Sequence, residues 1–76
     1  MVQNFLQQAL WDAAKTGDTA RIRILVVDGV DVHAVNADGQ NAIQIAIAHG
    51  QESAYKTLMA ASEMQRLLMG AVKRAA

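Results

Sequence analysis

The chain has no cysteine and no proline, and aromatic residues make up only 4% of its 76 residues. Without cysteine, neither a disulfide nor a thiolate metal site can stabilise so small a domain. A core of this size alone seldom supplies more than about 3–5 kcal/mol, so the stability has to come from packing within the chain or against another copy. We therefore expect a single small domain, residues 1–76, and its short repeat array and unclosed last helix, described below, favour a homo-oligomer.

An excess of charge of either sign is also missing. Seven Lys and Arg residues balance seven Asp and Glu residues, whereas nucleic-acid-binding proteins normally show a basic face. The uncharged stretches contain polar groups and are too short to span a bilayer. The N-terminus, MVQNFLQQALWD, lacks the basic region with which a signal peptide begins. We expect a soluble cytoplasmic protein that binds neither nucleic acid nor a membrane.

What the chain does contain is an internal repeat, which we infer from two glycines that lie 33 positions apart, Gly17 and Gly50. When the chain is overlaid on itself at this shift, six apolar positions coincide without a gap. Each copy is predicted to consist of two short helices that meet at its glycine. The coinciding pairs are Leu10 with Ile43, Ala13 with Ala46, Ala14 with Ile47, Ile22 with Tyr55, Leu25 with Leu58 and Val26 with Met59.

Local signals mark where these helices begin and end. Gly17 and Gly50 can adopt the left-handed conformation of a helix C-terminal cap. Asp18 is expected to cap the second helix of the first copy. Asn41, with Gln44 three residues later, forms a variant of the capping box at the start of the second copy. The helix faces predicted to be apolar are those of Leu10, Ala13 and Ala14, of Ile22, Leu25 and Val26, of Ile43, Ala46 and Ile47, and of Tyr55, Leu58 and Met59.

The segment between the two copies, residues 28–41, reads DGVDVHAVNADGQN. Gly29 ends the preceding helix, VDV is briefly extended, and NADG has the composition of a tight turn. We therefore predict a finger that projects from the helices and connects one copy to the next.

A repeat of 33 residues with two helices and a β-turn finger resembles the ankyrin repeat. The resemblance covers about residues 8–61 and implies an all-α fold of ankyrin-type helix-turn-helix repeats joined by one β-turn finger. The residues that follow add an extended C-terminal helix, in which the chain departs from the family. Repeat one is expected at about 4–36, repeat two at about 37–61, and a helical extension at 62–76. The residues that match the family pattern are Gly29, Asp31, Val32, Asp38, Gly39, Ala46 and Gly50.

The sequence also departs from that pattern. Where the family has Thr-Pro-Leu-His, residues 41–44 are Asn-Ala-Ile-Gln, so a proline that presets the start of the helix is missing. Repeat arrays usually need at least three units, and only two are present. The N-terminus has no finger, and Asn4 with Gln7 indicates a lengthened first helix that acts as a cap.

Two structures are compatible with the C-terminal extension. The last helix can run from Glu52 towards Ala75, which the lack of turn-forming residues in MAAS favours. Alternatively, Ser62 and Gln65 form a capping box, and Leu67, Gly70 and Ala71 form a third, finger-less cap. For the long helix we predict an apolar stripe of Ala54, Leu58, Ala61, Met64, Leu68, Ala71 and Ala75, and self-association through Met64, Leu68 and Ala71.

The resemblance implies a module that binds another protein and is not an enzyme. No catalytic, cofactor-binding or metal-binding residue is expected, because the chain has no cysteine, only two histidines and two serines, and no phosphate-binding loop. Ile45 is the most suggestive contact residue, because it is predicted to face solvent. Trp11 either packs against the finger or anchors a partner. The expected partner-binding residues, on the concave face and the finger, are Trp11, Asp12, Lys15, Val35, Asn36, Ile45 and His49.

Two other interpretations are open. The segment WDAAKTGDTARIRIL resembles a helix-turn-helix whose second helix carries Arg21 and Arg23, as in a small DNA-binding regulator. The zero net charge and the second copy, which lacks these arginines, argue against it. The chain can also be a fragment of a longer ankyrin array.

Overall fold

A computed structural model describes the backbone of residues 2–75 and the side chains of residues 5–67. It is all-α: none of residues 2–75 lies in a strand. The all-helical class expected from the sequence is therefore confirmed. The helices are α1 (Val2–Thr16), α2 (Thr19–Val27), α3 (Ala42–Ala48) and α4 (Glu52–Ala75).

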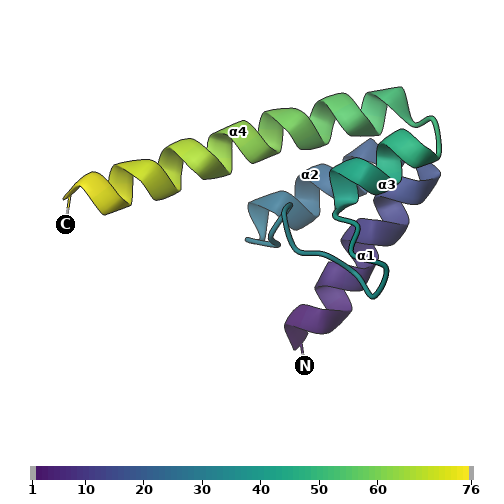
Figure 1. Ribbon diagram of the computed structural model, residues 1–76, viewed down its shortest axis with the longest axis horizontal. Helices are drawn as coiled ribbons and strands as arrows, with labels where there is room; N and C mark the ends of the chain where they lie inside the picture. The colour runs from purple at the N-terminus through teal and green to yellow at the C-terminus, as the bar shows by residue number, and fades with distance from the viewer. Residues whose placement is uncertain (1, 76) are drawn as a thin grey trace.

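The four helices form two stacked hairpins (Figure 1). In the first unit α1 packs against α2, and in the second unit α3 packs against α4. The two units stack with α1 beside α3 and α2 beside α4. The finger, residues 28–41, leaves the end of α2 and returns to the start of α3. This arrangement is the one that the 33-residue repeat predicts.

The predicted helix ends are confirmed. Gly17 and Gly50 both have positive φ, +80° and +67°, and each lies between the two helices of its unit. The side chain of Asp18 accepts a hydrogen bond from the Arg21 amide at the start of α2. At the start of α3, Asn41 Oδ1 accepts from the Gln44 amide and Gln44 Oε1 accepts from the Asn41 amide, both at 2.9 Å, which completes the capping box.

A single core lies between the four helices and the base of the finger. Its alanines let the helices approach closely, and its larger side chains, such as Leu10, Ile22 and Leu58, are fully buried. The finger contributes Val30 and Val32. The buried apolar residues are Leu10, Ala13, Ala14, Ile22, Leu25, Val30, Val32, Ala42, Ile45, Ala46, Ala54, Leu58 and Ala61.

The prediction of which face of α3 is apolar and buried was partly wrong. Ile45, expected to face solvent, is only 5% exposed, whereas Ile47, expected in the core, is 59% exposed. The core side of α3 consists of Ala42, Ile45 and Ala46. Ala14, the counterpart of Ile47 in the first unit, is fully buried, because the second unit stacks on the first, whereas no element within residues 2–75 forms a third unit beside α3.

The last helix is one continuous segment of 24 residues, so the long-helix alternative is confirmed and residues 62–75 do not fold back as a third cap. It runs well past the stack (Figure 1). Of the predicted apolar stripe, Ala54, Leu58 and Ala61 are buried, whereas Met64 is exposed, because the core side of α4 continues from Ala61 to Ser62 and the half-buried Gln65. Leu68 and Ala71 lie outside the described side chains.

Candidate protein-interaction site

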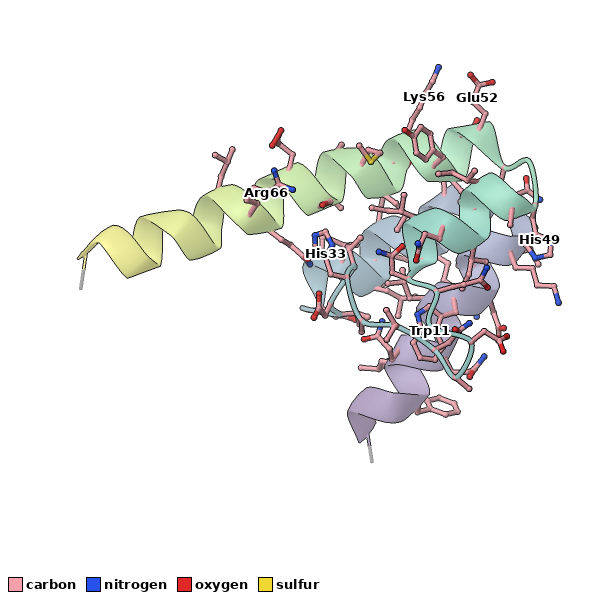
Figure 2. The ribbon with its side chains drawn as sticks, viewed as in Figure 1. Trp11, His33, His49, Glu52, Lys56 and Arg66 are labelled. Carbon is pink, nitrogen blue, oxygen red and sulfur yellow. The ribbon has the colours of Figure 1, made fainter. Side chains whose placement is uncertain are left out.

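The finger is attached to the inner helix α1 by two side chains. The indole Nε1 of Trp11 donates a hydrogen bond to the carbonyl oxygen of Ala34 at 3.2 Å. One turn earlier, Gln7 Nε2 donates to the carbonyl oxygen of Asp31 at 2.8 Å. Trp11 is half-buried and lies beneath the finger (Figure 2). Of the two interpretations of Trp11, the structure thus shows packing against the finger.

The tip of the finger has a defined shape, which Asn36 holds from within. Its Oδ1 accepts hydrogen bonds from the amides of Asp38 at 2.9 Å and Gln40 at 3.0 Å. The Asn36 amide donates to the Gln40 carbonyl, and the Gly39 amide donates to the Asn36 carbonyl. Asn36 is therefore half-buried and structural, whereas Val35 beside it is the large apolar side chain that the tip exposes to solvent.

The base of the finger is held from the other side by α4. Gln65 Nε2 donates to the Val30 carbonyl at 3.0 Å, and Gln65 Oε1 accepts from the Val32 amide at 3.3 Å. Three residues earlier on α4, Ser62 Oγ and His33 Nε2 are hydrogen-bonded at 2.8 Å. The amide of Gln65 thus satisfies two backbone groups that an isolated finger would leave to water.

The sequence did not predict the hydrogen bonds that Ser62 and Gln65 of α4 and Gln7 of α1 make with the finger. Each joins residues 24 to 35 positions apart, and no periodicity or turn pattern identifies a hydrogen-bond partner at such a distance along the chain. The only available signal was the polar character of Ser62 and Gln65 on a helix face that is otherwise apolar.

The remaining predicted residues occupy the exposed surface of the inner helices. Asp12 and Lys15 are exposed on α1, and His49 is exposed at the C-terminal cap of α3. The turn between α3 and α4 is attached to the end of α1, because Gln51 Nε2 donates to the Lys15 carbonyl at 3.0 Å. His49 lies at the end of α3 that is remote from the finger (Figure 2). Ile45 does not belong to this surface. We call the remaining set the finger face: it comprises Trp11, Val35 and Asn36 at the finger, Asp12 and Lys15 along α1, and His49 at its far end.

We also looked in the described part of the chain for a small-ligand pocket, a metal site and a membrane-spanning helix. A shallow pocket of about 100 Å³ lies between α1 and the base of the finger, where Leu6, Gln7 and Val30 line it. Pockets for small ligands are typically about 300–1,000 Å³. Among residues 5–67, no three His, Asp or Glu side chains are grouped so that they could hold a metal ion. Within the same limits, the helices are too short or too polar to cross a membrane.

Stacked helix pairs that share one core and are joined by a fixed finger define a helical repeat protein. Comparison with protein families identifies which repeat it is: the family described as "Ankyrin repeats (many copies)" matches residues 10–58, more than half of the chain. The chain belongs to the ankyrin repeat family, and the resemblance inferred from the sequence is confirmed. Ankyrin repeats serve as protein–protein interaction modules, and the family is generally non-enzymatic. Searches of curated proteins and of solved structures give no match.

Proposed function

We propose that the chain binds another protein through the finger face and has no chemistry of its own. The observation that carries this proposal is the fixed shape of the finger, which α1 and α4 hold from both sides while Val35 stays exposed at its tip. A surface that is ordered before binding loses less conformational entropy when a partner docks. An ordered finger is therefore a favourable binding element.

The chemistry of the finger face favours a partner with a small apolar centre and mixed polar surroundings. Val35 supplies an apolar contact, and the half-buried Trp11 ring lies under the same finger. Asp12 and Lys15 carry opposite charges on adjacent turns of α1. Such rim charges chiefly set specificity and the association rate, so we expect a complementary pair of charges on the partner.

Affinity capture with the intact protein as bait tests this proposal. Replacing Val35 by Asp should reduce the amount of a specifically retained protein at least tenfold, because a carboxylate would replace the apolar contact. The matched control is Val27→Asp, at an exposed valine on the outer helix α2, which should leave capture unchanged. Equal losses in the two variants, or no loss in Val35→Asp, would contradict binding through the finger face.

We further propose that the chain forms a homo-oligomer through the exposed side of α4, with Met64, Leu68 and Ala71 as contact residues. The support is that α4 overruns the stack (Figure 1) and that Met64 and Leu67 are 60% and 66% exposed. Light scattering at micromolar concentration should give a mass above the 8.2 kDa of one chain, and Leu68→Glu should return it to the monomer. A clean monomer of the unaltered protein would contradict self-association.

A DNA-binding role is the alternative that we disfavour. The helix that carries Arg21 and Arg23 is the outer helix α2, which packs against α4, and Arg21 lies 3.8 Å from the carboxylate of Asp18. We expect no mobility shift of duplex DNA. A shift that weakens steeply with salt would favour this role, because phosphate contacts produce such a dependence. A cytoplasmic location remains a prediction from the sequence, which localisation of the tagged protein would test.

A further inference from the structure

The second unit leaves an apolar end face uncovered. We define the end face as Ile43 and Ile47 on α3 with Tyr55 and Met59 on α4. Ile47 and Met59 are exposed, and Ile43 and Tyr55 are partly buried. Their counterparts in the first unit, at the 33-residue shift, are fully or partly buried where the two units stack. These counterparts are Leu10, Ala14, Ile22 and Val26.

The internal repeat indicates what such a face binds. In the first unit the same four positions are buried or partly buried on α1 and α2, the helices on which α3 and α4 pack. The antiparallel hairpin of α3 and α4 turns near Gln51, so Ile47 lies level with Tyr55, and Ile43 with Met59. The end face is thus a continuous apolar surface whose complement is a helix with small and aliphatic residues.

The opposite end of the stack does not offer that complement. The second unit buries Ile45 and Ala54, but the first unit has Asp12 and Arg21 at the same two positions, and both are exposed. Covering the end face with this end of another copy would bury two charged side chains, which is costly unless both are paired. Open-ended stacking of copies head to tail is therefore disfavoured.

The complement is present at the other end of the sequence, in the tail segment, residues 64–71 of α4. Its Leu67, Gly70 and Ala71 place one aliphatic and two small residues at i, i+3 and i+4, the same spacing and kinds of residue as the buried Ala42, Ile45 and Ala46 of α3. Met64 and Leu67 are exposed. Because α4 is a single straight helix that leads away from the stack (Figure 1), the tail segment does not lie over the end face of its own chain.

We propose that the end face of one copy binds the tail segment of a second copy, and that the second copy's end face binds the first tail in return. This inference rests on the proposed self-association and identifies the surface that the exposed side of α4 contacts. The exchange is isologous, so it closes at two chains and leaves no free copy of either surface. The net charge of zero means that the two copies do not repel each other.

Because the chain has no cysteine, introduced cysteines report contacts without background. An equimolar mixture of the Ile47→Cys and Leu67→Cys proteins, oxidised under mild conditions, should give a disulfide-linked heterodimer as the main product. The control mixture pairs Leu67→Cys with Val27→Cys, at a still more accessible site on α2, and should cross-link at least five-fold less. A heterodimer yield no greater than that of the control would overturn the exchange.

A second measurement separates this inference from the proposed self-association. Ile47→Glu and Ile24→Glu make the same change at exposed isoleucines, 59% and 62% accessible, so both variants should stay folded by circular dichroism. Ile47→Glu should raise the dimer dissociation constant at least tenfold, and Ile24→Glu should leave it within two-fold. If both variants remain dimers, the end face is not the contact although self-association stands. If the unaltered protein is a monomer, both proposals fail.

Discussion

At the scale of single residues, each unit has an equivalent glycine turn between its helices, but the surroundings of the two glycines differ. Gly17 and Gly50 adopt the same left-handed conformation between their helices. A Cβ at Gly50 would meet open space, whereas a Cβ at Gly17 would lie 2.5 Å from Gln51 Oε1. The left-handed conformation of both glycines was predictable, because helix ends require it. The proximity of Gln51 to Gly17 was not, because it arises only where the second unit packs on the first.

We therefore expect Gly17→Ala to destabilise the protein more than Gly50→Ala. The shared cost of a left-handed alanine is about 1–2 kcal/mol. Gly17→Ala also forces the side chain of Gln51 to move and to release the Lys15 carbonyl, a hydrogen bond worth about 1 kcal/mol. Urea unfolding of the two variants measures the difference in the free energy of unfolding. Equal losses would mean that Gln51 moves aside without cost.

At the scale of elements, the part of α4 next to the stack holds the finger in place. Ser62 stands where the repeat predicts a helix-ending glycine, so α4 continues, and the next turn brings Gln65 to the base of the finger. The continuation of α4 was predictable, since MAAS contains no turn former. Which side of α4 packs inward could not be settled from its apolar residues, because Ser62 and Gln65 lie on that side and Met64 does not.

Replacing Gln65 by Ala should lower the free energy of unfolding by about 1–3 kcal/mol, because the Val30 carbonyl and the Val32 amide lose their partner near the core. Hydrogen exchange of the Val32 amide should accelerate more than that of the α1 amides. The control is Arg66→Ala, at the next and exposed position of the helix, for which little change is expected. Unchanged exchange at Val32 in Gln65→Ala would contradict the role assigned to the glutamine.

At the scale of the whole molecule, neither unit has a core of its own. Leu10 and Ile22 of the first unit are fully buried, and α1 and α2 contact the helices of the second unit at least as extensively as they contact each other. In repeat proteins, stability is divided between the units and their interfaces. Residues 2–75 contain one interface between units, so both units have to fold together.

A peptide of residues 1–40 should accordingly be mostly unfolded, although it contains α1, α2 and nearly the whole finger. Its helices have 15 and 9 residues, and isolated helices shorter than about 12–15 residues are marginal in water. Circular dichroism should show a weakly helical peptide without a cooperative thermal transition, whereas the 76-residue chain should melt cooperatively. A cooperative transition in the peptide would show that the first unit is stable by itself.

The sequence alone determined the number of units, their 33-residue period, the helix ends and the finger, since these depend on local signals such as caps, glycines and the spacing of apolar residues. Only the tertiary structure decided that Ile45 is buried and Ile47 exposed, and that Gln7, Trp11 and Gln65 hold the finger. The physical reason is that the burial of a side chain depends on which element lies beside it. A helix with apolar residues on more than one face does not specify which of them its neighbour covers.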